Sequence, residues 1–159
     1  MSVDAASVPL RRALQELRDT GYKLDATLAP TDAELADAAK AAAPKTRGAE
    51  LFARGDFASA ADKYRAALSW DATDPRTWAN RAACFSRLRR FDEALRDAEY
   101  AIRLKPRFSR AHYRLAEARL GQGRVGDALE ACNAGLLLDG DEKTRRDLSA
   151  LMERCTVVE

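Results

Sequence analysis

The sequence predicts an all-α protein built from stacked helix pairs, and three observations support this. Hydrophobic residues make up 47% of the 159 residues, and much of that share is alanine, the best helix former. Aromatic residues amount to only 7%, which indicates a thin, distributed core. Ala60, Ala94 and Ala128 stand 34 residues apart. Self-similarity at this period is typical of stacked helical repeats.

Three consecutive segments, 41–74, 75–108 and 109–142, can be aligned on this period without insertions. Each is predicted to form a helix, a short turn and a second helix. The turns within the segments are expected at Gly55-Asp56, Arg89-Arg90 and Gly121-Gln122-Gly123. Helix breakers between and after the segments stand at Asp74-Pro75, Lys105-Pro106 and Asp139-Gly140.

Other aligned positions agree with this division. Small residues are expected where two helices cross closely, because a larger side chain would push the backbones apart. The columns that share a place in the repeat are Ala67, Ala101 and Gly135; Tyr64, Ala98 and Cys132; and Pro44, Trp78 and His112. The single histidine therefore takes the place of a tryptophan, which predicts a packing role for it.

The predicted domain organisation is an N-terminal helical extension (1–43), the repeats (44–142) and a C-terminal capping helix with its tail (143–159). In the extension, a helix is expected from Pro9 to Thr20 with leucines on one side. A second begins at the capping box of Thr31 and either ends at Pro44 or continues, kinked, into the first repeat. The extension either caps the array or binds a partner or a second copy through Leu10, Leu14 and Leu17. A helix from Asp141 to Arg154 is expected to cover the last repeat.

Composition argues against several classes of function. The net charge is +2 and the basic pairs are scattered, so nucleic acid is not an expected partner. No apolar stretch approaches the ~18–20 residues that span a membrane. Three distant cysteines and one histidine supply neither a zinc site nor a catalytic triad. We therefore expect no metal, no cofactor and no catalysis, in a cytoplasmic protein that could also be nuclear.

The chain resembles the tetratricopeptide repeat family over residues 41–142. Two stretches carry the resemblance, ELFARGDFASAADKYRAALSWDATDP and TWANRAACFSRLRRFDEALRDAEYAIRLKP. The third repeat is looser but keeps Ala128 and the repeat length. The resemblance implies a right-handed α-solenoid of three helix pairs, in which the first helix of each pair lines a concave groove.

Within this family, one subset holds peptides ending in Glu-Glu-Val-Asp through a carboxylate clamp. These peptides are the tails of the seventy- and ninety-kilodalton heat-shock chaperones. The resemblance places the clamp on Lys45, Asn80, Arg110 and Arg114. Arg110 stands where the family has lysine, and Ala49 stands where it has an asparagine. Ala49 therefore lacks one hydrogen bond to the peptide. Other candidate groove contacts are Ala49, Phe52, Arg76, Ala83, Arg87, Tyr113 and Glu117.

The clamp residues suit a peptide that ends in two neighbouring carboxylates. Lysine offers a compact charge and arginine a planar fork, while an asparagine can donate and accept at once. The predicted function is a co-chaperone or adaptor that binds acidic C-termini. The alternative is a structural scaffold that assembles through the N-terminal helix or the convex face and binds no tail. The groove charges could also be solvated or paired with neighbours, as the i,i+3 spacing of Arg114 and Glu117 allows.

Overall fold

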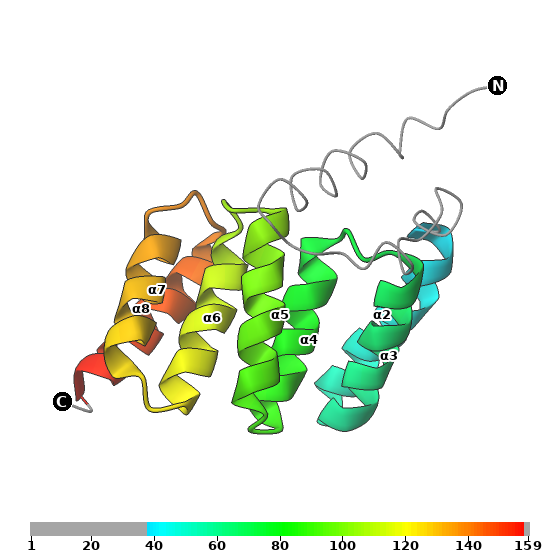
Figure 1. The fold of residues 1–159 in the computed structure, drawn as a ribbon, viewed down its shortest axis with the longest axis horizontal. Helices are drawn as coiled ribbons and strands as arrows, with labels where there is room; N and C mark the ends of the chain where they lie inside the picture. Colours follow the sequence, from blue (N-terminus) through cyan, green and yellow to red (C-terminus); the bar gives the residue numbers. More distant parts are fainter. Residues whose placement is uncertain (1–37, 158–159) are drawn as a thin grey trace, which may run out of the picture.

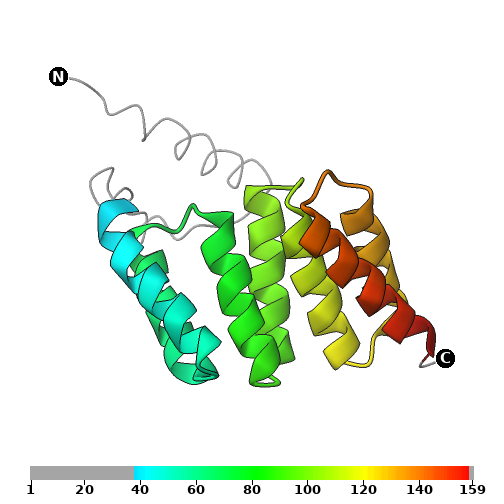
Figure 2. The same cartoon turned by 180° about the vertical axis from the view of Figure 1, so that it is seen from behind.

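The computed structural model describes residues 38–157, which form seven α-helices and no strand. In chain order the helices are α2 (Ala38–Ala53), α3 (Phe57–Trp70), α4 (Pro75–Arg87), α5 (Phe91–Leu104), α6 (Ser109–Gly121), α7 (Val125–Leu136) and α8 (Glu142–Val157). Figures 1 and 2 show the pairs α2–α3, α4–α5 and α6–α7 side by side, with α8 at the far end. The all-α solenoid predicted from the repeat is confirmed.

Helix α2 contains the proline at which the sequence left two possibilities open. The described part of α2, Ala38–Ala53, passes through Pro44, so the helix continues into the first repeat rather than ending there. The predicted border at residue 44 therefore falls inside a helix. Packing against α3 holds α2 despite the missing proline N–H: Ala41 is fully buried, and Gly48 lies against the ring of Tyr64. The predicted helix over 9–20 and the capping box at Thr31 lie outside the described residues.

The turn inside each helix pair uses the same backbone conformation at equivalent positions. Gly55, Arg89 and Gly123 are spaced by 34 residues, and their φ angles are 83°, 58° and 76°. These are left-handed values, which glycine adopts without steric cost. Arg89 adopts the same conformation without being glycine, because the repeat geometry around it requires the turn.

This shared conformation leads to a matched pair of predictions. Gly123→Ala should lower the free energy of unfolding by about 1 kcal/mol, because alanine in the left-handed region is strained. Gly126→Ala should be neutral or stabilising by up to about 1 kcal/mol, because Gly126 lies in the first turn of α7. Neither added methyl group would meet an atom within 4 Å, so the two variants differ only in backbone conformation. Urea unfolding measures both, and equal effects would contradict the argument.

The small-residue columns that the repeat predicts are part of the buried core. Ala60, Ala94 and Ala128 are fully buried, as are Ala67 and Ala101. The third repeat has Gly135 in the latter column, where a methyl group would come within 2.9 Å of Leu148 on α8. Here the capping helix packs so closely that even alanine would not fit without movement.

Trp78 and His112 share a column and make the same hydrogen bond. The Trp78 indole Nε1 donates to the carbonyl of Ala72 at 2.8 Å. His112 Nε2 lies 3.0 Å from the carbonyl oxygen of Pro106, also six residues earlier. Both rings therefore link the start of a repeat to the preceding loop. This supports the packing role predicted for the histidine.

Helix α8 covers the end of the array, as predicted. It buries Leu148, Leu151 and Cys155 and packs against both α6 and α7. Its observed bounds extend three residues beyond the predicted end at Arg154. Among the residues that the structure describes, no helix is long and apolar enough to cross a lipid bilayer.

Candidate functional site

The predicted site residues lie on the first helices of the three pairs. α4 packs directly on α6, and α6 packs on α8, so these helices form a continuous row. α2 is connected to the row through α3 and the loop before α4. The row carries Lys45 on α2, Asn80 on α4, and Arg110 and Arg114 on α6. The first turn of α8 lies next to Arg110 and Arg114, at the end of the row farthest from α2.

Lys45 is held by the loop between the first two repeats. Its Nζ donates to Asp74 Oδ2 at 3.0 Å and lies 3.9 Å from Asp71 Oδ2. Asp74 also caps α4, because its side chain accepts from the backbone N–H of Arg76. Burial alone would raise the pKa of Asp74, but the hydrogen bonds from Lys45 and Arg76 outweigh it and lower the pKa. Lys45 is thus paired with an ionised internal carboxylate.

Arg110 and Arg114 lie one turn apart and open onto a common pocket of about 110 Å³ between α6 and α8. Each has an acidic neighbour. Arg114 Nη1 donates to Glu117 at 3.0 Å, and Arg110 Nη2 lies 3.6 Å from Asp141. The Arg114–Glu117 pair is the one that the i,i+3 spacing allowed. Arg114 nevertheless keeps a buried Nε without a hydrogen-bond partner in the described part of the chain.

Asn80 is half-buried on α4. Within residues 38–157 its side-chain amide makes no hydrogen bond to any group. It therefore keeps a free donor and a free acceptor, as a peptide-binding asparagine requires.

Three of the remaining candidate contacts are buried or half-buried. Ala83 is only 4% exposed and belongs to the core, so it offers little surface to a ligand. Phe52 is half-buried and packs edge-on against Phe57, with ring centroids 5.1 Å apart. Tyr113 is half-buried beneath the guanidinium of Arg114, at 4.9 Å. Its hydroxyl pKa is raised, chiefly by burial.

Four candidate contacts remain, and they differ in which neighbouring groups they contact: Ala49, Arg76, Arg87 and Glu117. Ala49 is exposed and offers no polar side-chain atom. Arg76 is exposed beside Asp74, at 3.3 Å. The Arg87 guanidinium lies 5.7 Å from the ring centroid of Phe57, and Glu117 is engaged by Arg114. None of these four residues lines the pocket shared by Arg110 and Arg114.

Sequence reasoning missed the contribution of α8. Lys143, Thr144 and Asp147 line the pocket opposite Arg110, Tyr113 and Arg114. A signal was available, because residue 144 is one repeat length after Arg110 and two after Arg76. α8 thus takes the place of a fourth first helix, although the sequence pattern after residue 142 indicates only a cap.

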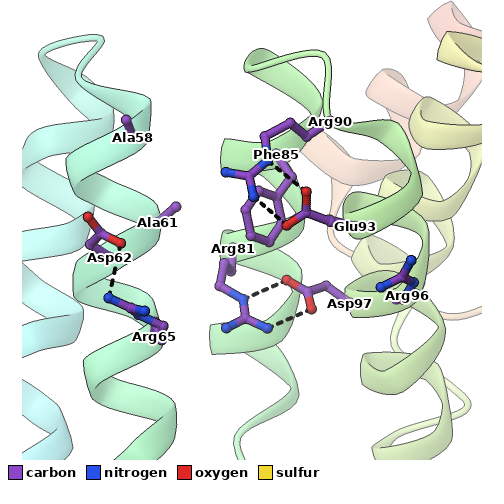
Figure 3. Close-up of a pocket in the computed structure, with 10 residues that line it drawn as sticks. All are labelled: Ala58, Ala61, Asp62, Arg65, Arg81, Phe85, Arg90, Glu93, Arg96 and Asp97. Carbon is purple, nitrogen blue, oxygen red and sulfur yellow. Dashed lines mark hydrogen bonds and ion pairs between the residues drawn. The ribbon is translucent and has the colours of Figure 1, made fainter.

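A second pocket, of about 440 Å³, lies between α3 and the pair α4–α5. Figure 3 shows that its walls carry three arginine–carboxylate pairs, Arg65–Asp62, Arg81–Asp97 and Arg90–Glu93. The guanidinium groups of Arg81 and Arg90 also lie near the ring of Phe85, at 5.5 and 4.8 Å. Since these charges are already paired with each other, we interpret this region as a structural network.

Comparisons with known proteins agree with the repeat. A tetratricopeptide repeat model matches residues 87–155. The chain is 35% identical over 127 residues to small glutamine-rich tetratricopeptide repeat-containing protein 2 of Saccharomyces cerevisiae, which covers 80% of this chain and 36% of that protein. The chain spans about a third of the length of the curated relatives it matches first.

Two solved structures illustrate the likeness in three dimensions. One is the TPR2B domain of yeast Sti1 in complex with an Hsp70 peptide. It matches with a TM-score of 0.70 and 28% sequence identity, and the match covers 76% of this chain and 98% of the Sti1 chain. The other is the second TPR domain of human RPAP3 with the HSP70 peptide SGPTIEEVD: TM-score 0.63, 28% identity, covering 70% and 94%.

The described region is therefore an α-solenoid of 34-residue helix pairs with a charged row along its first helices. By sequence and by structure, the chain belongs to the tetratricopeptide repeat family.

Proposed function

We propose that this domain binds the acidic C-terminal peptides of cytosolic heat-shock chaperones and acts as a non-catalytic co-chaperone or adaptor module in the cytoplasm. The observation that carries the proposal is the pocket onto which Arg110 and Arg114 open together, one helical turn apart. Two guanidinium groups can hold a carboxylate bidentately, and the second carboxylate of a terminal Asp lies within the same residue.

The other clamp positions support the proposal in different ways. Asn80 has an unengaged amide that can fix the direction of a peptide backbone. Lys45 supplies charge at the opposite end of the row. The structures of Sti1 and RPAP3 domains contain peptides named for Hsp70, and the RPAP3 peptide ends in Glu-Glu-Val-Asp.

Ala49 and the internal ion pairs limit the affinity that we expect. A charged hydrogen bond contributes about 1.5–3 kcal/mol, but Lys45 must leave or share Asp74 to make one. Ala49 adds no hydrogen bond. We expect micromolar rather than nanomolar binding, on the order of 8 kcal/mol.

The experiment is a titration of a fluorescent peptide ending in Glu-Glu-Val-Asp, followed by anisotropy in low and physiological salt. The control is the same peptide with an amidated C-terminus. We expect micromolar binding of the free acid, weakening of about tenfold or more on amidation, and further weakening as salt rises. Equal affinity for the two peptides, or no binding of either, would contradict the proposal and favour the scaffold alternative.

A further inference from the structure

The first turn of the capping helix α8 forms one wall of the pocket that holds Arg110 and Arg114. Lys143 and Thr144 of this turn, with Asp147 of the next, face Arg110, Tyr113 and Arg114 of α6 across about 110 Å³. A ligand that reaches both arginines must therefore meet α8. The helix does more than cover the hydrophobic core.

Asp141 is held in place beside Arg110 by its role at the start of α8. Its Oδ1 accepts from the backbone N–H of Thr144 and its Oδ2 from the Thr144 hydroxyl, both at 2.8 Å. The same Oδ2 lies 3.6 Å from Arg110 Nη2. These hydrogen bonds to Thr144, with a smaller contribution from Arg110, lower the pKa of Asp141. The carboxylate thus stays ionised next to the guanidinium that a peptide would use.

Lys143 has the opposite charge and no partner among residues 38–157. It lines the pocket, is exposed, and makes no ion pair or hydrogen bond with any described residue. A cation in the first turn of a helix is also unfavourable with respect to the helix dipole, so helix stability does not account for it. Its ammonium is available to an anion that enters between α6 and α8.

The pocket is close to balanced in charge before a ligand arrives. Arg110, Arg114 and Lys143 are offset by three acids, since Asp147 also lines the pocket and Asp141 and Glu117 pair with the arginines. An incoming carboxylate gains little electrostatic energy unless it replaces Asp141 or Glu117 as the partner of an arginine. Among the internal acids, Asp141 has the longer ion pair, 3.6 Å against 3.0 Å for Glu117, and is the easier to displace.

We propose that the first turn of α8 sets the affinity of the site for acidic peptides in two opposing ways. Lys143 contributes a third cation that binds a peptide carboxylate, and Asp141 competes with that carboxylate for Arg110. This inference rests on the proposed function and identifies residues that tune it. The ligand class is a peptide with at least two carboxylates near its C-terminus.

The test compares two variants that should change affinity in opposite directions. Asp141→Asn should tighten binding of the free-acid peptide about two- to fivefold, and Lys143→Gln should weaken it by a similar factor. Asparagine still caps the helix but offers one acceptor oxygen where aspartate offers two, so Asp141→Asn should fold with a thermal stability slightly below that of the wild type.

Two controls carry the same charge changes outside the pocket. Asp139→Asn alters a side chain that is 99% exposed and whose neighbour is Arg107, not Arg110. Arg145→Gln removes an exposed cation from the same helix turn as Lys143. At physiological salt, distant charges are screened, so each control should change affinity by less than about 1.5-fold.

The outcomes separate this inference from the function on which it rests. If the wild type binds the free acid selectively but either variant behaves like its control, the role of α8 is refuted and the peptide site stands. If neither the wild type nor Asp141→Asn binds the free acid, both proposals fall. Opposite shifts in the two variants, with silent controls, would support the inference.

Discussion

Replacing Arg81 with methionine should lower the free energy of unfolding by about 3–5 kcal/mol, the largest effect that we expect of any single substitution discussed here. Arg81 Nε and Nη2 donate to the two carboxylate oxygens of Asp97 at 2.7 and 2.8 Å. The two side chains are only 17% and 6% exposed. Removing the arginine leaves an ionised carboxylate in the interior without a counter-charge.

The pKa of Asp97 indicates what the complete pair contributes. Burial raises this pKa, and the hydrogen bonds from Arg81 lower it without fully offsetting burial. The cost of taking the charge out of water is therefore not recovered by the ion pair. The double variant Arg81→Met/Asp97→Leu should regain most of the stability lost in Arg81→Met, because it removes both charges together.

A matched control is present in the same pocket (Figure 3). Arg90 and Glu93 form an equally short bidentate pair, at 2.7 and 2.6 Å, but both side chains are substantially exposed. Arg90→Met should cost less than about 1 kcal/mol. Urea unfolding followed by far-ultraviolet circular dichroism measures the three variants against the wild type. Similar losses in Arg81→Met and Arg90→Met would show that burial is not the deciding factor.

The second prediction concerns ligand binding. Arg114→Ala should weaken binding of a free-acid Glu-Glu-Val-Asp peptide about ten- to hundredfold, the loss expected for one charged hydrogen bond in a partly desolvated site. Its side chain is 21% exposed, half the value for Arg110, so Arg114 is the better shielded from solvent and the stronger binder. The dependence of affinity on salt should also diminish, because one cation is lost.

Two further variants make this result interpretable. Arg107→Ala removes an exposed cation just before α6 that does not line the pocket, and should leave affinity nearly unchanged. Arg114→Lys keeps the charge but loses the planar fork, so its affinity should lie between those of the wild type and Arg114→Ala. If Arg114→Ala folds and binds the peptide with unchanged affinity, Arg114 is not part of the clamp.

Much of the fold could be predicted because it depends on local chemistry repeated three times. The alanine columns, the turns at Gly55 and Gly123, and the break at Pro75 each follow from the steric needs of a few neighbouring residues. Arg89 shows the limit of this reasoning, because its left-handed backbone is imposed by the repeat and not by its own preference.

The charged row was predictable only as a set of candidates. Helical spacing places Arg110 and Arg114 on one face, but it does not reveal which acids are near them. The partner of Lys45 is 29 residues away, and that of Arg110 is 31 residues away in the loop before α8. Such pairs depend on how successive repeats stack, which the pattern within one repeat does not encode.

The sequence by itself determined the period, the helix pairs and the identity of the cations along the first helices, because each depends on residue type and short-range spacing. The tertiary structure alone decided which acids engage those cations. It placed Asp74 on Lys45 and Asp141 beside Arg110, left the Asn80 amide without a hydrogen bond to any described residue, and brought Lys143 to the pocket. The physical reason is that electrostatic interactions depend on distance and burial, which are set only when the repeats pack together.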